Sequence, residues 1–160
     1  MPFMLSNWKN FSPEEAVSRE SLAAHIQTLS STFLVAEKDG KILGYLEGPV
    51  RPERYLKDIS FTEEIEDYGH LDGGFISLTS LSISKDAQGM GVGRKLLEAM
   101  KEIAIADERH GINLTCHDYL TAYYEKHDFV NEGLSKSTYA GAAWFDMVWE
   151  NPSLKLQKNQ

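Results

Sequence analysis

Hydrophobic residues along the chain form several strand-like runs. Residues 32–36 and 42–46 are two such runs, and the Asp-Gly pair between them is typical of a tight hairpin turn. A third run covers Phe75–Ile83, and a fourth, over 142–150, is rich in aromatic residues. Each of these four runs predicts a strand.

Helical spacing appears in two segments. After the third run, apolar residues recur every three or four positions and predict a helix over 91–109 with Gly111 as its C-cap. Near the start, Ser12-Pro13-Glu14-Glu15 combines an N-cap, a first-turn proline and a capping box. This combination predicts a second helix that begins at Ser12.

A strand, a helix and a strand are predicted between 112 and 130. Ile112–His117 is typical of a short buried strand, and Asp118 is a candidate N-cap for a helix over 119–126. Phe129 begins the next strand. Residues 134–141 then resemble a loop.

The run Gln88-Gly89-Met90-Gly91-Val92-Gly93-Arg94-Lys95 lies between the third strand and its helix. Alternate glycines remove side chains that would keep an anion from the backbone N–H groups, and a helix N-terminus adds free donors and a positive dipole end. A Walker loop is excluded because no glycine is followed by Lys and a hydroxyl residue. A Rossmann fingerprint is excluded because Leu96 occupies the position of its third glycine. The run therefore predicts a phosphate-binding loop of another type.

Two motifs carry a family resemblance. Gln88, Gly91 and Gly93 fit the pattern Gln/Arg-x-x-Gly-x-Gly/Ala, and a Tyr-Glu-Lys-x-Gly-Phe-like signature follows about thirty residues later at Tyr124 and Phe129. The usual glycine of that signature is Asp128, a residue type that tolerates left-handed backbone. The chain thus resembles the GNAT superfamily of acyl-CoA-dependent N-acetyltransferases.

The resemblance implies a fold and a cofactor. The expected fold is α/β (α+β), with a central mixed, mainly antiparallel twisted sheet flanked by helices and a splayed cofactor strand. Acetyl-CoA is the expected cosubstrate, with pantetheine along the cofactor strand, pyrophosphate on the loop amides, and no metal. The implied contacts are Leu81, Ser82, Ile83, Gln88, Gly89, Met90, Gly91, Val92, Gly93 and Arg94. Tyr124 matches the family tyrosine that protonates the leaving sulfur, whereas Tyr123 is expected to pack.

The acceptor amine and the general base stay open. Residues 32–150 resemble arylalkylamine (serotonin-type) N-acetyltransferases and their microbial relatives, which implies direct attack by a small primary amine. A polyamine, a lysine or a protein N-terminus is the alternative, and a non-catalytic CoA-binding module is a further one. Ser77 and Thr79 occupy the places of that branch's histidine pair, and neither can act as a base near pH 7. A water chain, a carboxylate, His70 or His117 must then remove the amine proton.

Composition narrows the class of protein. The 160 residues suit one domain over 1–150 with a polar, frayed tail over 151–160. A net charge of −8 opposes nucleic-acid binding, and we expect no membrane span. The single cysteine, Cys116, favours a reducing, cytoplasmic location and is expected to be a buried core residue.

Two further segments carry expectations. Residues 51–70 contain six carboxylates and three basic residues, which is typical of a solvated loop or of a substrate lid that attracts a cationic amine. Only eleven residues precede Ser12, so the family's first strand is expected to be shortened or missing, with its neighbour's edge covered by another subunit of a homodimer. A misassigned start codon is the alternative.

Overall fold

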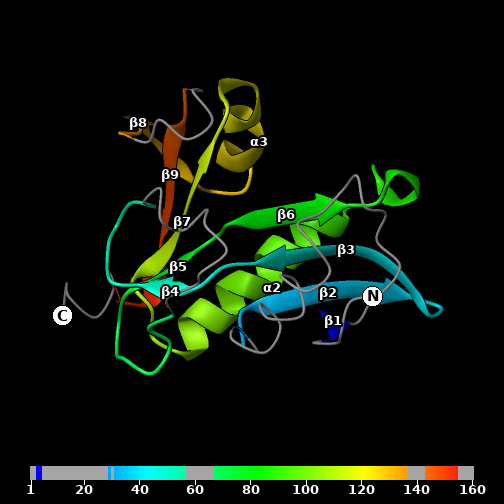
Figure 1. Ribbon diagram of the computed structural model, residues 1–160, viewed down its shortest axis with the longest axis horizontal. Helices are drawn as coiled ribbons and strands as arrows, with labels where there is room; N and C mark the ends of the chain where they lie inside the picture. The colour runs from blue at the N-terminus through cyan, green and yellow to red at the C-terminus, as the bar shows by residue number, and fades with distance from the viewer. Residues whose placement is uncertain (1–2, 5–28, 30, 57–66, 137–142, 155–160) are drawn as a thin grey trace.

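The protein is described here by a computed structural model that covers residues 3–4, 29, 31–56, 67–136 and 143–154. Two sheets share one long helix, α2 (Val92–Ala106), which packs against strands of both (Figure 1). This mixed α/β arrangement confirms the predicted fold class. Within the described residues, no helix is long and apolar enough to cross a membrane.

The first sheet is antiparallel throughout, in the order β1-β2-β3-β6. The second has the order β4-β5-β7-β9-β8, and its β5–β7 pair is parallel. The strand bounds are β1 (Phe3–Met4), β2 (Phe33–Lys38), β3 (Lys41–Glu47), β4 (Val50–Arg51), β5 (Phe75–Ser77), β6 (Ser80–Ile83), β7 (Gly111–Cys116), β8 (Val130–Leu134) and β9 (Phe145–Glu150). Three short helices complete the described elements: η3 (Lys85–Ala87), η4 (Asp118–Leu120) and α3 (Thr121–Glu125).

The hairpin between β2 and β3 is confirmed. Lys38 pairs with Lys41, and Asp39 and Gly40 both adopt left-handed backbone, with φ of 53° and 78°. This combination is required by the tightest hairpin turn, and it explains the Asp-Gly pair.

A first strand is present among the described residues, so of the two alternatives that the sequence left open, a missing strand is excluded. β1 has two residues, and Phe3 and Met4 pair with Ala36 and Val35 of β2. The predicted helix that begins at Ser12 lies outside the described residues.

The strand predicted over Phe75–Ile83 is interrupted, which corrects the sequence interpretation. The N–H of Leu78 donates to the carbonyl of Asn113 at 2.8 Å, whereas the N–H of Thr79 donates to the carbonyl of Glu47 at 2.9 Å. The chain therefore changes its partner from β7 to β3 between adjacent residues. Residues before the break belong to the second sheet as β5 and those after it to the first sheet as β6, so β6 and β7 separate beyond this point.

The predicted end of the long helix is wrong by three residues. α2 ends at Ala106, and Glu108, with φ of 56°, adopts the left-handed backbone that was assigned to Gly111. Gly111 instead begins β7, where an added Cβ would lie 2.1 Å from the carbonyl oxygen of Trp149. This glycine is needed because two strands approach closely.

The segment after β7 also differs from prediction. Asp118 is the first residue of the 3₁₀ turn η4 rather than an N-cap, and α3 covers Thr121–Glu125 instead of 119–126. Asp128 adopts left-handed backbone, with φ of 71°, as expected of the residue that replaces the family glycine. The first residue of the tail predicted over 151–160 is packed against the domain: Asn151 is buried, and its side-chain amide donates to the carbonyl of Arg109 at 2.9 Å.

Candidate active site

A cavity of about 370 Å³ lies where β6 and β7 separate. Its walls come from both strands, from β3, and from the residues around α3 and β9. The lining residues are Tyr45, Leu46, Leu78, Thr79, Ser80, Leu81, Ser82, Leu114, Thr115, Cys116, His117, Leu120, Tyr124 and Trp144. The cavity thus brings together Leu81, Ser82, His117 and Tyr124 of the predicted site; Ile83 ends β6 beyond the lining.

The predicted phosphate-binding loop follows β6 after the short helix η3. Gly89 and Gly91 are exposed, adopt left-handed backbone (φ of 83° and 77°), and would hold a Cβ in open space. Gly91 is the N-cap of α2. Among the described residues, no backbone acceptor takes the N–H groups of Gly89 or of residues 91–94. The loop therefore presents free donors at the positive end of the α2 dipole.

Two residues of the loop, Gln88 and Met90, have backbone N–H groups that are already paired. The N–H groups of Gln88 and Met90 donate to the carbonyls of Lys85 and Ala87. Arg94 lies on the exposed surface of α2, with its Nε 3.0 Å from a carboxylate oxygen of Glu98. Gln88 and Met90 can therefore contact a ligand through exposed side chains, and Arg94 adds positive charge beside the loop.

Gly93 differs from the other two glycines. An added Cβ would lie 2.3 Å from the hydroxyl oxygen of Tyr123, so the absence of a side chain serves packing rather than anion access. The Tyr123 ring lies between Tyr124 and His127, with centroid distances of 5.1 and 4.7 Å. Tyr123 packs, as predicted, and its hydroxyl contacts the first turn of α2.

Tyr124 lies on the cavity wall and is 9% exposed. Its ring makes an edge contact with Phe129 at 5.8 Å, and its carbonyl accepts the N–H of Phe129, so the signature residues hold one another in place. Burial raises the pKa of the Tyr124 phenol well above its usual value, and nearby Cys116 and Tyr123 raise it further. The hydroxyl therefore stays protonated at neutral pH and can donate to a group in the cavity.

The sequence model of the Acetyltransferase (GNAT) family matches residues 3–129. The chain belongs to the GNAT acetyltransferase family. It is an acyl-CoA-dependent N-acetyltransferase, and no protein of curated function matches its sequence.

Solved structures share the fold of this acetyltransferase. Ard1 from Thermoplasma volcanium has a TM-score of 0.64 at 14% identity, covering 86% of this chain and 82% of that chain. Naa20 of Chaetomium thermophilum, in complex with a bisubstrate analogue, has a TM-score of 0.64 at 20% identity and covers 85% and 74%. The ribosomal-protein-alanine N-acetyltransferase of Brucella melitensis has a TM-score of 0.60 at 21% identity and covers 86% and 81%. These similarities support the fold.

The two histidines considered as bases lie in different places. The acetyltransferase holds His117 at the cavity wall, where its ring stacks on Trp144 at a centroid distance of 4.3 Å and on Tyr119 at 5.6 Å. His70 is exposed, stacks on Tyr68, and does not line this cavity. Of the two, the geometry brings only His117 to the site.

Ser77 and Thr79 lie on either side of the strand break. Ser77 is fully buried, and its Oγ has no hydrogen-bond partner among the described residues. Thr79 lines the cavity, and its Oγ1 is 3.5 Å from the carbonyl oxygen of Glu47. Neither hydroxyl has an imidazole or a carboxylate paired with it among the described contacts, so neither position supplies a base by itself.

Sequence reasoning missed three polar residues whose side-chain oxygens are buried without a partner next to this site: Asn113 and Thr115 on β7, and Asp146 on β9. A signal was present, since each interrupts an otherwise apolar strand. Among the described residues, no group of three or more His, Cys, Asp or Glu side chains is arranged to hold a metal ion.

Proposed function

We propose that the enzyme transfers the acetyl group of acetyl-CoA to a primary amine by direct attack within a ternary complex. The observation that supports this most strongly is the position of β6. This strand leads toward the open glycine loop at Gly89 and Gly91, and its residues Leu81 and Ser82 line the cavity where Tyr124 lies. A nucleotide pyrophosphate at the loop would therefore direct its pantetheine arm toward Tyr124.

The edge of β6 suits pantetheine. Leu81, Ser82 and Ile83 pair with β3 on one side, and no strand among the described residues pairs with the other side. The amides of pantetheine can hydrogen-bond to such a free strand edge, and a backbone N–H there can polarise the acetyl carbonyl. The acidic chain, with its net charge of −8, gains local positive charge at the loop from Arg94 and the helix dipole.

Tyr124 is assigned as the general acid. Transfer breaks the C–S bond of the thioester and leaves a thiolate, whose parent thiol has a pKa near about 8.5. Because burial keeps the Tyr124 phenol protonated, it can donate this proton as the thiolate forms.

We further propose that the acceptor is a small amine with an aromatic group. The His117 ring stacks on both Trp144 and Tyr119 where β7 ends, and Trp144 and His117 line the cavity. Stacked rings offer a flat surface for an aryl group. This choice also rests on the resemblance to arylalkylamine acetyltransferases.

A peptide N-terminus is the second candidate. Naa20 from Chaetomium thermophilum and the ribosomal-protein-alanine acetyltransferase from Brucella melitensis share the fold, which favours a protein acceptor. The stacked rings could equally receive an apolar first side chain.

A thiol-release assay with acetyl-CoA tests these proposals across arylalkylamines, polyamines and short peptides. We expect the highest kcat/KM with an arylalkylamine, and a faster peptide would favour the second candidate. Tyr124→Phe is the matched control, because it keeps the ring and removes the donor. Acetyl-CoA binding without turnover of any acceptor would make the chain a non-catalytic module, and the absence of binding would refute the proposal.

A further inference from the structure

Four buried side-chain oxygens lie together on one face of the second sheet. They are Ser77 Oγ, Asn113 Oδ1, Thr115 Oγ1 and Asp146 Oδ1, and none has a hydrogen-bond partner among the described residues. Ser77, Asn113 and Asp146 are 0%, 1% and 8% exposed. Because an unpaired buried polar group costs about 1–3 kcal/mol, four together indicate a site for a polar ligand or ordered water.

Strand register makes this group contiguous. Ser77 pairs with Asn113 across β5 and β7, and Thr115 pairs with Asp146 across β7 and β9. Asn113 and Thr115 are two residues apart and so share a face. Side chains of opposed residues in antiparallel strands have Cβ atoms about 4.5–5.5 Å apart. We call these four residues the polar strip.

The polar strip reaches the cavity through Thr115. Thr115 lines the cavity, as do Thr79 and His117. The intervening residues of β7, Leu114 and Cys116, belong to the core packed with α2. The strip therefore lies on the face away from α2, beside the edge of β7 that borders the cavity.

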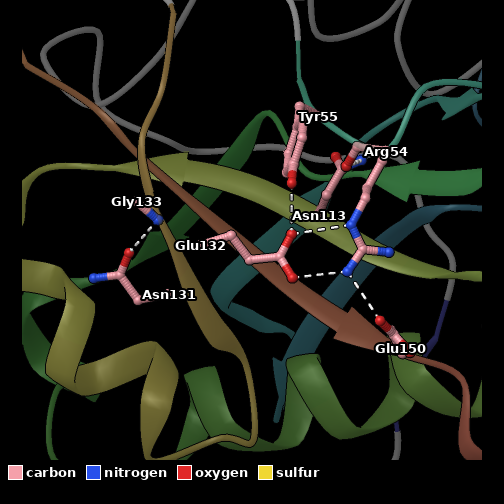
Figure 2. Close-up of polar contacts among 7 residues, drawn as sticks. All are labelled: Arg54, Tyr55, Asn113, Asn131, Glu132, Gly133 and Glu150. Atoms are coloured by element: carbon pink, nitrogen blue, oxygen red, sulfur yellow. Dashed lines mark hydrogen bonds and ion pairs between the residues drawn. The ribbon is translucent and has the colours of Figure 1, made fainter.

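The carboxylates of Glu132 on β8 and Asp146 on β9 influence each other electrostatically, and Glu132 is paired with a cation. Arg54 holds Glu132 in a two-point ion pair at 2.9 and 2.7 Å and also contacts Glu150 at 2.9 Å (Figure 2). The hydroxyl of Tyr55 donates to Glu132 at 2.8 Å. The Arg54 fork lowers the pKa of Glu132 and fixes it as a structural anion.

The pKa of Asp146 is shifted in the opposite direction from that of Glu132. Burial raises the pKa of its carboxyl, the negative charge of Glu132 raises it further, and a hydrogen bond with Ser135 opposes the shift. Arg54, the cation of this cluster, is already held by Glu132 and Glu150. Asp146 is therefore a carboxylate with increased proton affinity and one unpartnered oxygen, opposite Thr115 in the strand register.

We propose that Asp146 takes the proton of the acceptor ammonium through the hydroxyl of Thr115 and one ordered water that bridges these two unpartnered oxygens, the task that Ser77 and Thr79 cannot perform. This inference rests on the proposed acetyl transfer to a primary amine. It assigns Asp146 and Thr115 to proton removal and leaves Tyr124 as the acid.

The proton and electron balance is complete. Thr115 Oγ1 accepts one proton from the ammonium while its own proton passes to an ordered water between the two side chains, and that water gives a proton to Asp146 Oδ1, which leaves a neutral amine, an unchanged water and a neutral acid. The amine lone pair forms a C–N bond to the thioester carbon, and the C–S bond then breaks with its electron pair on sulfur. Tyr124 protonates the thiolate and recovers the second amine proton, while Asp146 releases its proton to solvent.

The pH dependence of kcat/KM tests this relay. An alkylammonium has a pKa near about 10, so an enzyme without a base must use the small fraction of neutral amine. We expect Asp146→Asn to reduce kcat/KM about 100-fold at pH 7, in the range for general bases. The loss should shrink steadily as the pH approaches 10, because the amine then needs no base.

Two further variants separate the relay from a structural role. Thr115→Val should reproduce the pH-dependent loss, whereas Thr115→Ser, which restores the hydroxyl, should stay within a few-fold of the wild-type enzyme. Asp107→Asn is the matched control, because it makes the same substitution at an exposed aspartate after the end of α2, and its profile should be unchanged. The rise in melting temperature with acetyl-CoA should persist in every variant.

The possible outcomes are distinct. A wild-type profile in Asp146→Asn, or a loss of equal size at every pH, would overturn the inference while the proposed function stands. If Asp146→Asn does not fold, the Thr115 pair decides, and a Thr115→Val enzyme with the wild-type profile would overturn it. A wild-type protein that acetylates no amine would refute the proposed function itself.

Discussion

The contact between Gly93 and Tyr123 yields a quantitative prediction about the first turn of α2. In Gly93→Ala, the new Cβ would meet the Tyr123 hydroxyl oxygen at 2.3 Å, so the ring or the helix must move. Overpacking of this kind costs about 1–3 kcal/mol. Alanine in place of glycine in a helix returns about 0.5–1 kcal/mol. We expect a net loss of about 1–2 kcal/mol in the free energy of unfolding.

Tyr123→Phe should remove this cost. The next atom of the ring, Cζ, is 3.6 Å from the added Cβ, an ordinary van der Waals contact. In the Tyr123→Phe background, Gly93→Ala should therefore be neutral or stabilising by up to about 1 kcal/mol. The coupling between the two substitutions should be about 1–3 kcal/mol, as for residues in direct contact.

Urea unfolding of the four proteins in this double-mutant cycle measures the coupling. Gly91→Ala is the control, because its Cβ meets nothing within 4 Å and its cost comes from left-handed backbone alone. That cost, about 1–2 kcal/mol, should be the same with Tyr or Phe at 123. Additive effects of Gly93→Ala and Tyr123→Phe, or a stabilising Gly93→Ala alone, would refute the packing argument.

Four other outcomes are expected. Tyr124→Phe should lower kcat at least about tenfold in thiol release while acetyl-CoA still raises the melting temperature, and an unchanged kcat would exclude this phenol as the acid. Gly91→Glu should abolish that acetyl-CoA shift by placing negative charge at the exposed loop; a retained shift would contradict the loop assignment. Arg109→Met should lower the free energy of unfolding in urea by about 3–5 kcal/mol, since the buried guanidinium donates to three loop carbonyls. A loss below about 1 kcal/mol would show that these hydrogen bonds do not stabilise the loop. Asp146→Asn should raise the free energy of unfolding at pH 8, because an acid whose pKa is raised in the folded state destabilises the fold when it is ionised. The gain should vanish below about pH 4, the pKa of an aspartate in the unfolded chain, and a gain that is independent of pH would contradict a raised pKa.

Local chemistry made much of the fold predictable. The Asp39-Gly40 turn depends on two residues and their backbone angles, and the left-handed Asp128 depends on one. The loop at Gly89 and Gly91 and the position of Tyr124 follow from short motifs that act over a few residues. Such features are readable because the residues that decide them are neighbours in the sequence.

Features that depend on partners elsewhere in the chain were not predictable. The apolar run Phe75–Ile83 is continuous, and nothing within it marks the exchange of β7 for β3 at Leu78 and Thr79. Thr115 and Asp146 are opposed because of strand register, which no local pattern specifies. The role of Gly93 likewise depends on a tyrosine thirty residues away. The candidate acid was therefore proposed from sequence, whereas the candidate base was not.

Cys116 has a chemical consequence for an enzyme that handles a thioester. Its thiol lines the same cavity as Tyr124, so it is a second nucleophile beside the acetyl group. Burial raises the pKa of this thiol to about 11. At pH 7 about one molecule in ten thousand would then carry the reactive thiolate. The apolar packing around β7 thereby protects the enzyme from acetylating itself, and the acetyl group is kept for the amine.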